Sequence, residues 1–245
     1  MAREVQPPIE SRMLTDTPGA AGEDQAPTDR PLAINLQNLQ KNFGEERVLK
    51  GLTLQVAKGE IFGLIGPSGS GKSTAIHLMC GHLEPTGGTV EVLGENPSHF
   101  STSTRRRIGY MPQDFILNPD LTVKQNLSFA AGLYGIGWLR ARKRIPAILK
   151  LVELEAARGQ VARSISGGMQ RRLALAAALV QNPVMLFADE PTANLDPILR
   201  AKLWAHFREM KDQGRTILIT TQYIDEAEYC DRVGLMYDGA LIAEG

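Results

Sequence analysis

Cysteines and long apolar runs are both scarce in this sequence. Its 245 residues include only two cysteines, Cys80 and Cys230. Two cysteines are too few for a disulfide framework and suit a reducing compartment, so we interpret both as small core residues. No apolar run is long enough to cross a bilayer, and the N-terminus has no apolar signal-peptide core. The sequence therefore predicts a protein made and kept in the cytoplasm.

The sequence also has no excess of either charge, because 27 Lys and Arg residues balance 27 Asp and Glu residues. A neutral chain has no overall field that draws it to nucleic acid or anionic lipid, although a local basic patch stays open. Residues 140–144 hold four basic side chains close to Trp138. We interpret them as a solvated helix face rather than a nucleic-acid site, because the aromatic side chain is single. No nucleic-acid partner is expected.

Composition divides the chain into a tail and one domain. Residues 1–31 are rich in proline and polar residues with few large apolar side chains, which predicts a disordered tail, with a docking role as the alternative. The hydrophobic content of 43% suffices for a sizeable core over residues 32–245. We expect one domain with a subdomain.

A glycine-rich stretch at residues 66–74 follows the apolar segment 61–65 and precedes the mostly apolar segment 75–80. The pattern GxxxxGKS between strand and helix is typical of a phosphate-binding loop, since glycines turn backbone N–H groups inward and a helix N-terminus favours anions. Lys72 then reaches the β- and γ-phosphates, and the Ser73 hydroxyl coordinates Mg²⁺. A chance glycine-rich turn is disfavoured by the flanking elements. The predicted loop residues are Gly66, Pro67, Ser68, Gly69, Ser70, Gly71, Lys72, Ser73 and Thr74.

Two carboxylates follow the continuous apolar run at residues 184–188, which indicates a strand buried on both faces. Ligands of open α/β sheets lie at the carboxyl ends of the strands. Asp189 can therefore hold Mg²⁺, and Glu190 can polarise a water for attack on the γ-phosphate. The segment 216–221 predicts another buried strand, and Gln222 follows it.

Other segments carry weaker signals. Ser166 and two glycines open a predicted helix and form a second anion-binding element, or an ordinary N-cap. Phe43, in a polar loop, could stack on a purine or pack on the sheet. Periodicity predicts antiparallel strands near 32–36 and 52–56, a short strand at 89–94, a helical region over 121–154 with Thr122 as N-cap, a helix over 198–212 and a tight turn at 238–239.

Taken in order, these motifs resemble the nucleotide-binding domain of ATP-binding cassette (ABC) transporters, over residues 32–245. Residues 66–74 match the family's Walker A loop and residues 184–190 its Walker B strand. The other matches are Phe43 to the adenine-stacking aromatic, Gln113 to the Q-loop glutamine, Ser166, Gly167, Gly168 and Met169 to the signature, and Asp196 to the D-loop. The signature is the most specific element, because other P-loop enzymes lack this second glycine pair.

The resemblance implies an α/β P-loop NTPase fold: a RecA-like parallel core, an antiparallel β-subdomain and an inserted helical subdomain at about residues 114–165. It also implies head-to-tail dimers, of identical or related domains, with each ATP between one Walker loop and the other protomer's signature. Ser73, Gln113 and Asp189 would hold the Mg²⁺ of the ATP. A membrane-spanning permease would supply the transport path and keep the protein on the inner face of the cell membrane.

The sequence departs from the family pattern at Gln222, where the family usually has a histidine that contacts the γ-phosphate and the attacking water. A glutamine amide donates and accepts hydrogen bonds but carries no charge. If the histidine acts as a cation, its absence slows turnover by about tenfold, and if it acts neutral little is lost. With Lys72 and Glu190 present, we expect an active ATPase whose catalytic residues are Lys72, Glu190 and Gln222.

Met169 and residues 221–227 resemble the branch of bacterial drug-resistance exporter ATPases, which favours an exporter subunit. Such ATPases often continue past the final hairpin, so Gly245 is a candidate domain boundary. Two other functions stay open: a soluble ABC ATPase acting on nucleic acid or ribosomes, and a slow regulatory ATP-binding module. The first usually carries tandem cassettes or long insertions that this chain lacks, and Gln222 is the only hint of the second.

Overall fold

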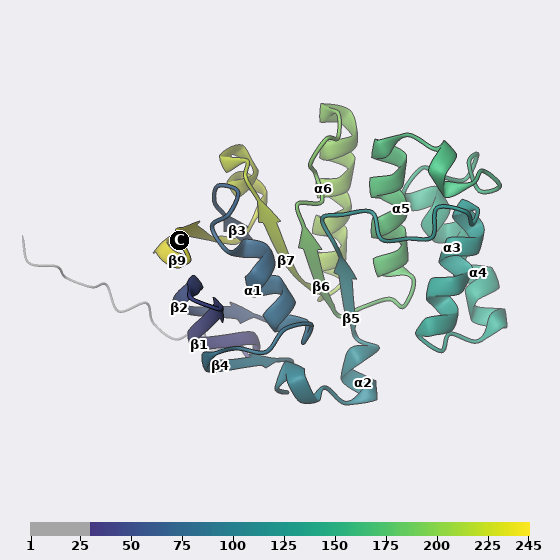
Figure 1. The fold of residues 1–245 in the computed structure, drawn as a ribbon. Helices are drawn as coiled ribbons and strands as arrows, with labels where there is room; N and C mark the ends of the chain where they lie inside the picture. The colour runs from purple at the N-terminus through teal and green to yellow at the C-terminus, as the bar shows by residue number, and fades with distance from the viewer. Residues whose placement is uncertain (1–29) are drawn as a thin grey trace, which may run out of the picture.

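The computed structural model describes residues 30–245, which form two sheets and a set of helices (Figure 1). Nearly all of the predicted tail at 1–31 lies outside the described residues. The strands are β1 (Leu32–Phe43), β2 (Glu46–Ala57), β3 (Ile61–Ile65), β4 (Gly87–Val92), β5 (Ile108–Met111), β6 (Met185–Asp189), β7 (Thr216–Thr221), β8 (Arg232–Tyr237) and β9 (Ala240–Glu244). The helices are α1 (Lys72–Met79), α2 (Thr102–Arg105), α3 (Val123–Leu133), α4 (Trp138–Leu151), α5 (Gly167–Leu179) and α6 (Pro197–Asp212).

The larger sheet has the strand order β5-β6-β7-β3-β8-β9. Its strands pair in parallel except for β8 and β9, which form the antiparallel hairpin predicted around Asp238 and Gly239. Every residue of β3, β6 and β7 is buried, which confirms the buried strands predicted at 184–188 and 216–221. A parallel core beside a separate antiparallel sheet confirms the predicted fold class.

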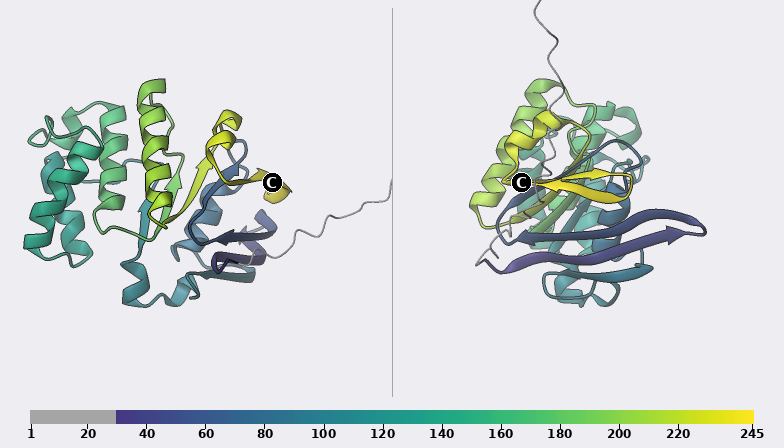
Figure 2. Two further views of the ribbon diagram at one scale, coloured as in Figure 1. Left: turned by 180° about the vertical axis from the view of Figure 1, so that it is seen from behind. Right: turned by 90° about the vertical axis from the view of Figure 1, so that its left-hand side faces the viewer.

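The smaller sheet has the order β2-β1-β4 and is antiparallel throughout. Leu36 and Leu39 of β1 are both fully buried although they lie three residues apart. A register shift between them, with Asn38 at φ 50°, inserts the extra residue that returns Leu39 to the core side. Helix α1 contacts both β4 of this sheet and β6 of the larger one, so it lies between the two sheets (Figure 2).

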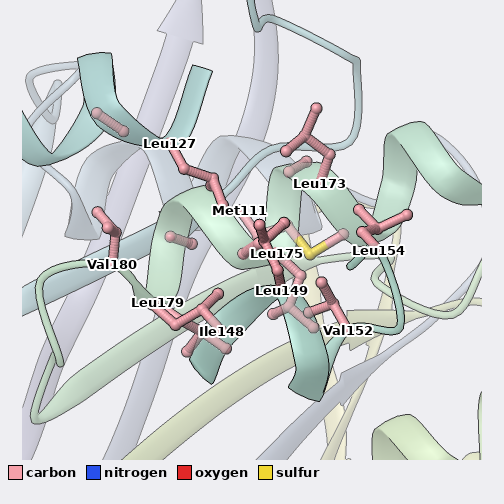
Figure 3. Packing of buried hydrophobic residues seen from close by; sticks show 14 of the residues in the cluster. Met111, Leu127, Ile148, Leu149, Val152, Leu154, Leu173, Leu175, Leu179 and Val180 are labelled. Atoms are coloured by element: carbon pink, nitrogen blue, oxygen red, sulfur yellow. The ribbon is translucent and has the colours of Figure 1, made fainter. Parts of the chain in front are cut away.

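Helices α3, α4 and α5 pack together at the end of the molecule opposite the smaller sheet (Figure 2). The predicted helical region over 121–154 is two helices, because the chain turns at Gly135, with φ 67°, before α4 begins. Thr122 caps α3 as predicted, in a capping box with Gln125. Leu127, Leu149 and Leu173 meet in the core between the three helices (Figure 3).

The segment 114–165, predicted as a helical subdomain, contains α3, α4 and a 3₁₀ turn at Ala162–Ser164. Within residues 30–245, no helix combines the length and apolarity needed to cross a membrane. Both cysteines are free, with Cys80 buried and Cys230 packed against the core. Burial raises the pKa of the Cys230 thiol to about 12, so that it stays protonated and serves as a core residue.

Candidate functional site

The predicted phosphate loop leaves the carboxyl end of β3 and enters α1. Gly66 is required by a close approach, because a Cβ there would lie 2.2 Å from the carbonyl oxygen of Met236. Gly69 and Gly71 have φ values of 80° and 98°, which glycine adopts without strain. Gly71 is also the N-cap of α1, so that the loop ends on backbone N–H groups at a helix N-terminus.

The ammonium group of Lys72 folds back over this loop. It donates hydrogen bonds to the carbonyl oxygens of Gly66 at 2.7 Å and Pro67 at 2.8 Å, and the residue is only 4% exposed. Burial lowers the pKa of Lys72, and the nearby carboxylates of Glu190 and Asp189 oppose that shift. Lys72 is thus a buried basic side chain that is held by two carbonyl oxygens of the predicted phosphate loop.

The hydroxyl of Ser70 is buried and has no hydrogen-bond partner. A buried polar atom of this kind normally finds a partner in the protein, water or a ligand. Ser70 does not line the cavity bordered by Gly69, Gly71 and Lys72, so its hydroxyl lies inside the loop rather than at the cavity surface.

Asp189 is the last residue of β6 and Glu190 follows it, so both lie at the carboxyl edge of the sheet, where the phosphate loop leaves β3. Asp189 is 1% exposed, and its carboxylate accepts a hydrogen bond from the Thr220 hydroxyl. Glu190 has a φ of 47°, which is strained for a residue with a Cβ. Its backbone N–H donates to the carbonyl oxygen of Thr220 at 3.1 Å and to the Thr220 hydroxyl at 3.0 Å. Thr220 therefore holds both acidic residues in place.

The carboxylate of Glu190 lies between two amides. One oxygen accepts from Nε2 of Gln222 at 2.8 Å, and the other accepts from Nε2 of Gln113 at 3.4 Å. Gln113, Glu190 and Gln222 follow β5, β6 and β7, and the phosphate loop follows β3, which are four neighbouring strands of the sheet. The carboxyl ends of parallel strands thus bring together residues that are far apart in sequence.

Two adjoining cavities open at this edge. The first is lined by the phosphate loop, including Lys72 and Ser73, and also by Gln113 and Glu190. The second shares Gln113 and Glu190 with the first and adds Gly167 and Gly168 from the start of α5. Among the described residues, none from 166–169 lines the first cavity. Gly167 and Gly168 therefore line a different cavity from the phosphate loop of the same chain, and of the described residues the two cavities share only Gln113 and Glu190.

Three other predicted residues lie at element ends. Ser166 is the N-cap of α5, where its hydroxyl accepts from the Met169 N–H at 3.3 Å. Asp196 caps α6 by accepting from the N–H groups of Ile198 and Leu199. Phe43 ends β1, is 47% exposed and has the Lys41 ammonium 5.1 Å from its ring centroid, but does not line the first cavity.

Sequence reasoning missed two residues that shape the site. Thr220 is a buried residue near the carboxyl end of β7. A polar side chain at the end of a predicted buried strand was the one sequence signal that could have pointed to it. Arg171 on α5 donates to backbone carbonyl oxygens that include those of Gln113 and Glu190, and no spacing rule points to it. The sharp turn at Asp238 and Gly239 also lines the first cavity, although it was predicted only as a hairpin.

The donors at the site suit Mg²⁺ bound with a nucleotide. Ser73 and Gln113 line the first cavity and Asp189 ends the neighbouring strand β6, so hydroxyl, amide and carboxylate oxygens, which Mg²⁺ prefers, occur at this edge of the sheet. Residues 30–245 contain no group of three or more His, Cys, Asp or Glu side chains that could hold a metal ion alone. Mg²⁺ needs no such cage, because it commonly takes one or two carboxylates and completes its shell with phosphates and water.

The sequence is similar to a known family and to curated proteins. Residues 49–193 match the family described as ABC transporter. The chain is 39% identical over 252 residues to the probable multidrug ABC transporter ATP-binding protein YbhF of Escherichia coli, a match that covers 99% of this chain and 43% of YbhF. It is 40% identical to the Nod factor export ATP-binding protein I of Paraburkholderia xenovorans, covering 87% of this chain and 70% of that protein. The chain thus spans less than half the length of YbhF.

Solved structures of ABC transporter cassettes have a similar fold. The dimeric bacterial ABC transporter cassette MJ0796 is 32% identical with a TM-score of 0.81, covering 86% of this chain and 97% of that one. A dimeric post-hydrolysis state of the same cassette, bound to ADP and Pi, has a TM-score of 0.80 at the same identity.

Proposed function

This chain belongs to the ABC transporter family and carries its ATPase domain, and on this basis we propose that two copies, or one copy and a related domain, bind ATP head to tail and hydrolyse it to power export. The observation that carries this proposal is that Glu190, which lines the phosphate-loop cavity, accepts hydrogen bonds from the amides of Gln113 and Gln222. A buried loop lysine and a positioned carboxylate at one sheet edge fit phosphoryl transfer to water. Export is supported by the names of the relatives, a multidrug transporter protein and a Nod factor export protein.

Residues of the phosphate loop would bind the triphosphate. Lys72 would exchange its two carbonyl acceptors for phosphate oxygens. Ser73, Gln113 and Asp189 would hold Mg²⁺, which neutralises charge developing on the phosphates. Phe43 would pack on the adenine, because its exposed ring ends β1 and its strand partner Glu46 lines the cavity.

Glu190 would act as general base on the attacking water. Its carboxylate already accepts two side-chain hydrogen bonds, which fix its orientation. Gln222 would orient the water or the γ-phosphate through its amide, which donates and accepts hydrogen bonds but takes up no proton. Proton removal therefore rests on Glu190 alone.

The second wall of each ATP site would come from the partner copy, through Ser166, Gly167, Gly168 and Met169, with Asp196 of the D-loop nearby. Packing within one chain does not explain the glycines: a Cβ at Gly167 would meet nothing within 4 Å, and one at Gly168 would meet only Leu195, at 3.8 Å. Both lie in the first turn of α5, where their own N–H groups have no partner within the helix and could bind an anion. A close approach by a partner's nucleotide explains glycine at both positions.

Replacing Gln222 with histidine tests the catalytic assignment. We expect Gln222→His to raise the ATP turnover by up to about tenfold, because an imidazolium forms charge-assisted hydrogen bonds to the γ-phosphate that an amide cannot. Phosphate release is measured at saturating ATP for the wild type, Gln222→His and Glu190→Gln. Equal and negligible rates in all three would contradict hydrolysis by this chain.

A membrane-spanning permease would be the second partner and would hold the chain at the inner face of the cell membrane. Four large apolar side chains of α3 and α4 are more than half exposed: Phe129, Leu133, Trp138 and Leu139. Because α3 and α4 contact each other, these exposed side chains offer an interaction surface, and an apolar segment of a permease exposed to the cytoplasm would cover it.

Charge placed on this surface should release the chain from membranes. In cells that make the protein, we expect Trp138→Glu with Leu139→Glu to lower the membrane-bound fraction by about fivefold, because a carboxylate cannot be buried without a partner. Ile242→Glu, at a 58% exposed site on β9, is the control. Unchanged membrane binding in the double variant would contradict this surface, and salt-sensitive binding to RNA would favour a role on nucleic acid.

A further inference from the structure

Arg171 joins the two chain segments that end in the site. Its guanidinium donates to the carbonyl oxygens of Pro112, at 3.3 Å, and Gln113, and to those of Asp189, at 2.9 Å, and Glu190. The first pair belongs to the segment after β5 and the second pair to the end of β6. One side chain thus fixes the spacing between the backbone that carries Gln113 and the backbone that carries Glu190.

The surroundings of Arg171 keep this contact strong. Burial lowers the pKa of the guanidinium, while the carboxylates of Asp189, Glu190 and Asp114 oppose that shift. Arginine stays charged in proteins, so its hydrogen bonds to the carbonyl oxygens are charge-assisted. Its planar fork can serve two acceptor pairs at once, which a lysine cannot do.

Arg171 also belongs to the helix whose first turn holds Gly167 and Gly168. It lies three residues after Gly168 in α5, which is about one helical turn. Gly167, Gly168, Arg171 and Glu190 line the same cavity. A shift of the start of α5 therefore moves the guanidinium, and with it the backbone of Gln113 and Glu190.

The next residue offers a natural contrast. Arg172 is also half-buried on α5, but it donates to the carbonyl oxygens of Val152, at 3.0 Å, and Glu153, at 3.2 Å, at the end of α4. It therefore ties the helix to its structural neighbours and does not touch the site.

We propose that Arg171 is a positioning residue that couples the two ATP sites of the dimer. When Gly167 and Gly168 contact the ATP bound to the partner, Arg171 moves with them and repositions Glu190 and Gln113 of its own chain. This inference rests on the proposed function, because it needs two ATP molecules between two copies. Arg171 thus determines the positions of Glu190, the general base, and of Gln113 when ATP binds at the opposite site.

The test compares Arg171→Gln with Arg172→Gln and with the wild type. The measurements are the dissociation constant of a fluorescent ATP analogue, and the kcat and Hill coefficient of ATP hydrolysis. For Arg171→Gln we expect ATP affinity within about twofold of wild type, a kcat lowered by about tenfold or more, and a Hill coefficient that falls to about 1. Arg172→Gln should keep the wild-type Hill coefficient, and a purely structural role for Arg171 would leave that coefficient unchanged.

A wild type that turns over ATP with a Hill coefficient above 1, combined with the same coefficient and kcat in Arg171→Gln, would overturn this inference alone. A wild type without turnover would overturn the proposed function and the inference with it. If Arg171→Gln does not fold, Arg171→Lys carries the test, because lysine keeps the charge but loses the fork: full wild-type kcat and cooperativity in that variant would also overturn it.

Discussion

Replacing Glu190 with glutamine should lower steady-state ATP turnover by about 100-fold or more while ATP still binds. Glutamine has the size of the carboxylate but cannot take a proton from the attacking water. It also presents an NH₂ group to one of the two amides that now donate to Glu190, so one of those hydrogen bonds is lost. The phosphate loop stays intact, which preserves binding.

The measurement is phosphate release at saturating ATP, together with the dissociation constant for ATP. Glu91→Gln is the matched control, because Glu91 is exposed on β4 of the smaller sheet. A Glu190→Gln enzyme that keeps more than about a tenth of the wild-type rate would contradict Glu190 as the general base, since such a base contributes at least ~100-fold.

Replacing Lys72 with methionine should weaken ATP binding by about 100-fold or more. The ammonium is the one basic side chain among the loop residues 66–74, and it lies 2.7–2.8 Å from two loop carbonyls. Two charge-assisted contacts to phosphate oxygens contribute about 3 kcal/mol, which corresponds to roughly 100-fold in affinity. Methionine keeps most of the buried volume, so that the loss reports on charge rather than on packing.

Titration with ATP and Mg²⁺ measures this effect, with a thermal unfolding curve to show that the variant folds. The control is Lys58→Met, which removes an exposed lysine before β3. An affinity within about fivefold of wild type in Lys72→Met, where ~100-fold is expected, would show that the loop binds phosphate without this side chain.

The phosphate loop could be predicted from sequence because everything it requires is local. A buried strand, turn glycines and a helix N-terminus follow one another within residues 61–80. The same holds for the Thr122 cap of α3 and for the Asp238-Gly239 hairpin. Each depends on backbone conformations that a few neighbouring residues decide.

The surroundings of Glu190 could not be predicted from sequence alone. Gln113 lies 77 residues before it and Gln222 lies 32 residues after it, and only the strand order β5-β6-β7 places all three together. Arg171 was missed for the same reason, because its acceptors are backbone carbonyls, whose positions depend on tertiary structure. The left-handed backbone of Glu190 has no sequence signal either, since strain of this kind is held by its neighbours.

The central claim is that one chain holds half of each ATP site, and the mass of the Glu190→Gln protein in solution tests it most directly. We predict that sedimentation or light scattering gives the mass of one chain without nucleotide and with ADP, and twice that mass with ATP and Mg²⁺. Adding Ser166→Arg, which places a long side chain at the start of α5, should return the single-chain mass with ATP. A single-chain mass for Glu190→Gln at saturating ATP would contradict the account.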